Sequence, residues 1–109
     1  MNNRDLQIII KIQSEIYIIE QFIYNLDFKS FESDERTKRA VCMTLINMGE
    51  LVKNLTDEFK SETKHIPWRV IAGMRDITAH KYQTIKMEDV WATMENDIPK
   101  LKQQLNELM

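Results

Sequence analysis

The residues best suited to chemistry lie together in residues 73–82, Gly-Met-Arg-Asp-Ile-Thr-Ala-His-Lys-Tyr, which we call the motif segment. On a helix, Asp76 and His80 would share a face because they are four residues apart. Arg75 would point about 140° away from His80, so the two converge only if the arginine folds back or the helix ends there. Tyr82 follows His80 by two residues, where a turn would swing its hydroxyl beside the imidazole. A permanent cation, a group that titrates near neutral pH and a phenol suit phosphate-ester chemistry.

Positive charge is concentrated around the motif segment. The 109 residues have a formal net charge of −2, which gives no overall signal for nucleic acid. From Thr63 to Met87, five basic residues stand against one acidic residue, a local charge of +4, while the ten basic and sixteen acidic residues elsewhere leave −6. A basic segment on an acidic protein predicts an anion-binding face. A solvated helix end would produce the same charge pattern, and this alternative stays open.

The polar residues of the motif segment also fit a structural role. Arg75 and Asp76 would then form surface ion pairs worth less than about 1 kcal/mol. His80 would favour the negative end of a helix, and Tyr82 would simply pack. Other kinds of site find no support: Cys and His do not occur at zinc spacing, and the two glycines form no phosphate-binding loop. We therefore expect neither a metal nor a cofactor.

Apolar periodicity predicts helices that hold the motif segment in place. Steps of three or four residues predict a first helix over roughly residues 3–26. A polar connector follows over residues 27–34, where Ser33 and Asp34 are good N-cap types for the next helix. That second helix has a near-heptad apolar pattern that continues to Phe59.

Helical periodicity continues in the second half of the chain, which includes a shorter helix. Pro67 suits the first position of a short third helix. Residues 83–86 indicate a turn, and a last helix is predicted from about Met87, with a kink at Pro99. With no linker long enough to divide it, residues 1–109 predict one domain: an all-α bundle of four or five helices, mostly antiparallel.

The first helix has more apolar residues than one core can use. Ile8, Ile10, Tyr17, Ile18 and Tyr24 lie off its main apolar stripe. A bundle of this size has little room for a fully enclosed helix, so we expect these residues to form the interface of a homodimer.

The single cysteine and the N-terminus bear on where the protein works. Cys42 is the only cysteine and lies in an apolar run, which predicts a buried, free thiol and fits a reducing cytoplasm. Charged and amide residues interrupt the apolar stretch near the N-terminus too often for a signal peptide or a membrane span. We expect a cytoplasmic protein without membrane contact.

Several of these features resemble one family. Arg75, four further residues, His80, Lys81 and Tyr82 fit the Arg-x4-His-x-Tyr motif of HEPN domains, specifically of HepT-like toxins. Further likeness lies in Ile66-Pro67-Trp68-Arg69, Met48-Gly49-Glu50, Val90-Trp91 and Glu95-Asn96-Asp97-Ile98-Pro99, so the resemblance covers most of the chain. Two positions depart from the common pattern: Asp76, where an amide or another polar residue is common, and Lys81, where glycine is frequent.

The resemblance implies a HEPN-like homodimer that acts as a metal-independent endoribonuclease, with two motifs facing each other across a basic cleft; further association of dimers stays open. Arg75 and His80 would be catalytic, and Asp76 and Lys81 would support them. The implied partners are the RNA substrate and a minimal nucleotidyltransferase antitoxin, which uses ATP to add AMP to Tyr82 and so silences the toxin.

Two other functions remain open at this stage. The first is a non-catalytic helical module that binds a nucleotidyltransferase partner or nucleotides. The second is a purely structural dimeric bundle. Incubation with RNA in the presence of EDTA separates a metal-independent nuclease from both.

Overall fold

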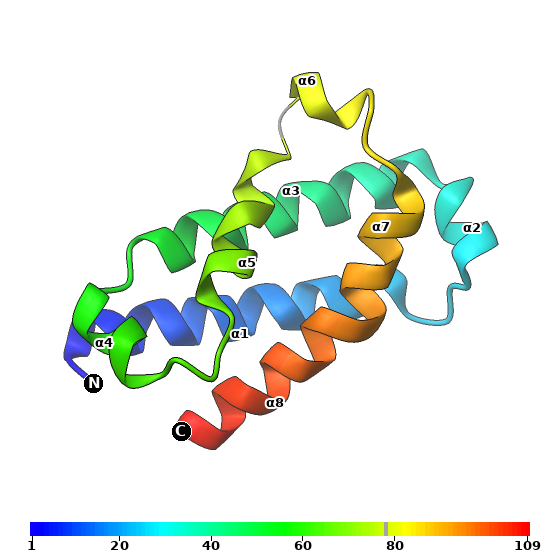
Figure 1. Ribbon diagram of the computed structural model, residues 1–109. Helices are drawn as coiled ribbons and strands as arrows, with labels where there is room; N and C mark the ends of the chain where they lie inside the picture. Colours follow the sequence, from blue (N-terminus) through cyan, green and yellow to red (C-terminus); the bar gives the residue numbers. More distant parts are fainter. Residues whose placement is uncertain (78) are drawn as a thin grey trace.

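The computed structural model describes the backbone of residues 1–77 and 79–109, together with all side chains of this part except those of Arg75, Ala79 and His80. Every regular element in these residues is helical, so the predicted all-α class is confirmed (Figure 1). The longer helices are α1 (Asn3–Ile23), α3 (Glu35–Lys53) and α8 (Ile98–Leu108). The shorter ones are α2 (Phe28–Glu32), α4 (Asp57–Glu62), α5 (Trp68–Ala72), the 3-10 helix η1 (Gly73–Asp76), α6 (Ala79–Tyr82), α7 (Met87–Ala92) and the π-helical turn η2 (Thr93–Asp97).

The long helices form an antiparallel bundle around one hydrophobic core. In Figure 1, α1 and α3 run side by side in opposite directions, and α8 returns along α1. The core is built from the predicted apolar stripes, including Ile9, Ile12, Ile16 and Ile19 of α1, Val41, Leu45, Met48 and Val52 of α3, and Ile98, Leu101 and Leu105 of α8. Burial of each such side chain stabilises the fold by about 1.5–3 kcal/mol, so the bundle depends mainly on these stripes.

The second helix ends earlier than its apolar pattern suggests. We expected one helix to continue to Phe59, but α3 ends at Lys53 and Phe59 belongs to α4. The break is fixed by Asp5, a fully buried carboxylate of α1, which accepts hydrogen bonds from the backbone N–H of Thr56 at 3.0 Å and from its hydroxyl at 2.7 Å. Thr56 also caps α4 by accepting from the N–H of Phe59. The chain therefore turns here and still buries Phe59.

The connector over residues 27–34 contains a short helix, α2. Its Phe31 is buried and packs on Trp91 of α7, with 5.1 Å between the ring centroids. Asp34 then caps α3, because its carboxylate accepts from the N–H of Thr37 at 3.1 Å. The predicted N-cap role of Asp34 is thus confirmed.

The last helical run is irregular just before Pro99. We expected a kink at the proline itself, but Pro99 lies in the first turn of α8, and the irregularity is the preceding π-helical turn. Proline lacks an N–H and its ring clashes with the carbonyl four residues earlier, so a widened turn on its N-terminal side accommodates it. The chain changes direction between α7 and α8 in Figure 1.

One face of α1 stays uncovered in the single chain. Ile10, Tyr17 and Tyr24, seven residues apart, are 42%, 61% and 74% exposed, and we call these three the α1 stripe. Ile8, which we expected on this face, is instead buried in the core, and Ile18 is half-buried. As predicted, Cys42 is buried and free. Among the described residues, none of the helices has the length and apolar character needed to cross a bilayer.

Candidate functional site

The approach to the motif segment is anchored by Trp68 at the start of α5. Its indole N–H donates to the Thr63 hydroxyl at 2.8 Å, and that hydroxyl donates to the Phe59 carbonyl at 2.8 Å. The Phe59 and Trp68 rings also contact each other, with centroids 5.9 Å apart. Pro67 lies at the N-cap of α5, one position before the expected first turn. This buried cluster fixes where α5, and therefore the motif segment, begins.

The motif segment is not one continuous helix. Past α5 the chain tightens into η1, which packs on α3, and Ile77 leaves helical geometry with ψ at 90°. A new helical turn, α6, then carries residues 79–82. The helix ends between Asp76 and His80, so the condition under which the two would share a helical face is not met. The side chains of Arg75 and His80 lie outside the described residues.

The two supporting candidates line one shallow cavity. Asp76 and Lys81 are exposed and border a space of about 290 Å³ together with Gly73, Ile77, Thr84 and Ile85. A carboxylate from η1 and an ammonium group from α6 thus border the same cavity.

Tyr82 is held by the N-terminal turn of α3. Its hydroxyl donates to Glu35 Oε1 at 3.0 Å, and the Arg39 guanidinium carbon lies 4.8 Å from the centre of its ring. Arg39 Nε also donates to Glu35 Oε1, at 2.9 Å, and Lys38 Nζ lies 3.1 Å from Glu35 Oε2. Cation–π contact and charge-assisted hydrogen bonds fix the phenol in one position against α3.

This arrangement sets the charge states of the two partners. Hydrogen bonds from Lys38 and Tyr82, followed by the nearby positive charges, lower the pKa of Glu35. Burial, followed by the hydrogen bond to Glu35, raises the pKa of Tyr82. At neutral pH, Glu35 is therefore a carboxylate, and Tyr82 is a protonated phenol that donates a hydrogen bond to it.

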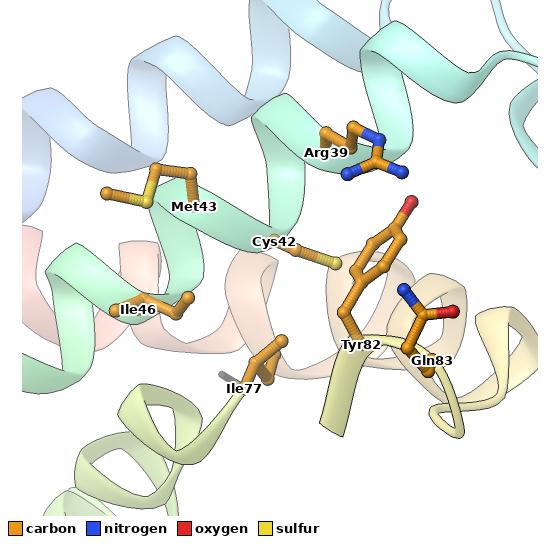
Figure 2. Close-up of a pocket in the computed structure, with 7 residues that line it drawn as sticks. All are labelled: Arg39, Cys42, Met43, Ile46, Ile77, Tyr82 and Gln83. Carbon is orange, nitrogen blue, oxygen red and sulfur yellow. The ribbon is translucent and has the colours of Figure 1, made fainter. Parts of the chain in front are cut away.

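A pocket opens between α3 and the end of the motif segment (Figure 2). We call it the Tyr82 pocket, and it has a volume of about 360 Å³. It is lined by Arg39, Cys42, Met43, Ile46, Ile77, Tyr82 and Gln83. In Figure 2 the guanidinium, phenol and amide groups gather at one end, and the side chains of Met43, Ile46 and Ile77 surround the other.

Sequence reasoning missed Glu35 and Arg39. A spacing of four residues at a helix start is typical of an ordinary surface ion pair. No local pattern connected that pair to Tyr82, which lies 47 residues from Glu35. Within the described part of the chain, no three His, Cys, Asp or Glu side chains are grouped so that they could hold a metal ion.

A second cavity carries positive charge at the start of α5. It has a volume of about 550 Å³, and Lys60, Lys64 and Arg69 line it beside Trp68. Lys64 and Arg69, two basic residues of the positive segment 63–87, therefore lie in a cavity beside Trp68 that is separate from the Tyr82 pocket.

Comparison with known proteins places this all-α chain in a class that is described as ribonucleases. The family model described as Ribonuclease HepT-like matches residues 12–108, and the chain belongs to this HepT-like family. The resemblance seen in the sequence is thus confirmed, and membership supports a ribonuclease function.

Individual relatives agree with this assignment. A protein of Thermococcus cleftensis, named as a probable ribonuclease HepT, is 37% identical over 89% of this chain and 88% of its own length. A protein of Caldanaerobacter subterraneus subsp. tengcongensis, named as a candidate RNase, is 36% identical over 85% of this chain and 82% of its own. No solved structure matches the chain.

Proposed function

We propose that this chain is a metal-independent endoribonuclease whose catalytic residues are Arg75 and His80, working as one HepT-like domain over residues 1–109. The observation that carries the proposal is the Arg75-x4-His80-x-Tyr82 motif within a chain that belongs to a ribonuclease family. The positive charge of residues 63–87 supports RNA as the substrate.

The proposed reaction needs a base and a cation. His80 takes the proton of the 2′-hydroxyl, whose oxygen attacks the adjacent phosphorus, and the bond from phosphorus to the 5′-oxygen breaks. Arg75 stabilises the negative charge that develops on the pentacoordinate phosphate. The leaving 5′-oxygen must receive a proton, and the His80 of a second copy is our candidate donor. Asp76 and Lys81, which border the same cavity, adjust the potential around Arg75 and His80.

A homodimer would supply these paired groups. The α1 stripe supports this part of the proposal, because exposed tyrosine and isoleucine side chains on one helix face are suited to an interface. We place the protein in the cytoplasm, where the buried, free thiol of Cys42 would stay reduced.

We further propose that the enzyme is the toxin of a toxin–antitoxin pair and that a minimal nucleotidyltransferase silences it by AMPylation of Tyr82. The phenol oxygen would attack the α-phosphate of ATP, pyrophosphate would leave, and the phenolic proton would pass to Glu35. The 3.0 Å hydrogen bond from Tyr82 to the Glu35 carboxylate supports this route. The added phosphate would place negative charge beside the motif and repel RNA.

The nuclease proposal is tested with purified protein and RNA in EDTA. We expect the wild type to cut, and Arg75→Ala and His80→Ala each to slow cleavage by about 100-fold or more, as loss of a catalytic acid–base or charge-stabilising group does. His65→Ala is the matched control and should cut like the wild type. If the wild type leaves RNA intact, the nuclease proposal is wrong and a binding module is favoured. If all variants cut like the wild type, Arg75 and His80 are not the catalytic residues.

A further inference from the structure

We propose that the Tyr82 pocket is the subsite for an unpaired guanine of the RNA, next to the phosphodiester that is cut. This inference rests on the proposed ribonuclease function and adds to it a place where one base is recognised. The proposed ligand is a guanine base within a single-stranded RNA.

The first support is position. Ile77 follows Arg75 by two residues, Tyr82 follows His80 by two, and both line the pocket. The pocket therefore takes two of its lining residues from the motif segment, which also contains the two proposed catalytic residues. A phosphodiester held by Arg75 and His80 would have a neighbouring base within reach of this cavity.

The second support is the distribution of apolar and polar groups. A nucleobase has apolar faces and a polar edge, and proteins bind unpaired RNA bases by contact with the faces and hydrogen bonds to the edge. Met43, Ile46 and Ile77 offer apolar surface for the faces, and Arg39 and Gln83 lie at the polar end (Figure 2). The volume of about 360 Å³ falls in the usual range for small-ligand pockets.

The third support is the charge and hydrogen-bonding character of the polar end, which selects among the bases. None of the described residues that line the pocket is acidic, and its one cation is Arg39. A guanidinium can only donate hydrogen bonds, so it matches the paired acceptors O6 and N7 of guanine, whereas adenine presents an amino group at the same edge. The nearby Glu35 carboxylate already accepts from Tyr82 and Arg39. The pairing with Glu35 offsets the charge of Arg39, so the preference for guanine rests on the hydrogen-bond donors of the guanidinium.

Nucleotide titration followed by methyl NMR of the full-length protein tests the pocket directly. We expect GMP to shift the Ile46 and Ile77 methyl signals at about tenfold lower concentration than AMP, CMP or UMP. The methyls of Ile10 and Val70, exposed elsewhere, should not move. The subsite is ruled out if GMP leaves Ile46 and Ile77 unchanged. It is also ruled out if their signals depend on protein concentration alone, which would assign the pocket to a second copy of the chain.

Cleavage of an RNA of mixed sequence tests the role in the reaction. The wild type should prefer cuts beside guanine by about tenfold, and Gln83→Ala and Met43→Glu should reduce this preference to about twofold or less. Both side chains are exposed, so the fold should tolerate the changes. Gln7→Ala and Met109→Glu are the controls; Met109 is 58% exposed against 56% for Met43. Equal cleavage beside all four bases by the wild type would contradict the subsite while leaving the nuclease intact. A wild type that cuts no RNA would instead contradict the proposed function, and the GMP titration would still decide whether the pocket binds guanine.

Discussion

Among single residues, Tyr82 is the motif residue with two defined contacts to α3. Its hydroxyl is bound by Glu35, and its ring lies under the Arg39 guanidinium. In an attack by this phenol, its proton would pass along the hydrogen bond to a carboxylate that belongs to another helix. Glu35 therefore acts as a positioning residue for Tyr82, and the two should be coupled in solution.

We predict that Glu35→Gln lowers the pKa of Tyr82. Burial raises this pKa most, followed by the hydrogen bond to Glu35 and its negative charge. Glutamine removes the charge but not the burial, so the pKa should fall toward the ordinary value for tyrosine without reaching it. The ultraviolet absorbance of tyrosinate, titrated in a Tyr17→Phe, Tyr24→Phe background, reports Tyr82 alone because the chain has three tyrosines. Glu58→Gln, at an exposed position, serves as the control; an unchanged pKa in Glu35→Gln would show that the hydrogen bond does not persist in solution.

The sequence predicted the motif residues but not their immediate partners. Arg75, His80 and Tyr82 could be selected because they lie close together along the chain. Glu35 could not, because its contact with Tyr82 depends on how α6 meets α3, and the sequence contains no local signal for that contact. For the same reason the Tyr82 pocket, which joins residues of α3 to residues after η1, was not predicted.

Among the helices, the junction of α1 with α4 depends on one buried carboxylate. We predict that Asp5→Ala lowers the free energy of unfolding by about 2–3 kcal/mol, because the Thr56 N–H and hydroxyl both lose their acceptor. Urea unfolding measures the change. Asp57→Ala, in the exposed first turn of α4, is the control and should cost less than about 1 kcal/mol. Equal losses in the two variants would contradict a specific role for Asp5.

The helix caps make stability depend on pH in the acid range. Hydrogen bonds from Thr37 lower the pKa of Asp34, and hydrogen bonds from Ser30 lower that of Asp27. A carboxyl whose pKa is lower in the folded state stabilises the fold above its unfolded pKa, and this stabilisation is lost as pH falls through the folded value. We predict that the urea midpoint decreases as pH falls below about 4. Asp34→Asn keeps a capping oxygen that does not titrate, so the decrease should be smaller. Asp89→Asn should leave the pH profile unchanged, and an equal decrease in Asp34→Asn and the wild type would be evidence against the cap.

The elements themselves were predicted more reliably than their ends. Periodicity identified the stripes of α1, α3 and α8 because burial imposes the helical period on the sequence. It failed between Lys53 and Phe59, where the apolar pattern continues but the carboxylate of Asp5, near the N-terminus, fixes a turn. It also gave no boundary at η1, where the chain leaves α-helical geometry within the motif segment. The break after Lys53 is set by a tertiary contact that no local window contains.

For the whole molecule, the α1 stripe is the feature that bears on whether the protein works as a monomer or as a dimer. Ile10 and Tyr17 lie seven residues apart on α1 and Tyr24 lies at its C-cap; all three are exposed, outside the core. A partner helix running along this face would cover them together, as the facing helix covers the seam of a coiled coil. The proposed nuclease would use such a partner, because His80 of one chain is assigned as the base and the reaction also requires an acid, for which the His80 of a second copy is our candidate.

We predict that Tyr17→Glu converts the proposed dimer to a folded monomer and abolishes the proposed RNA cleavage. A carboxylate at the centre of an apolar interface would be desolvated without a partner, at a cost that the remaining contacts of the α1 stripe would not offset. Because Tyr17 is exposed in the single chain, the circular dichroism and the urea midpoint should stay close to those of the wild type. Sedimentation equilibrium measures the mass, and Val70→Glu, an equally exposed apolar position on α5, is the control expected to stay dimeric and active. If Val70→Glu dissociates the dimer and Tyr17→Glu does not, the interface lies on the face of α5, beside the motif segment, and the two motifs would meet there.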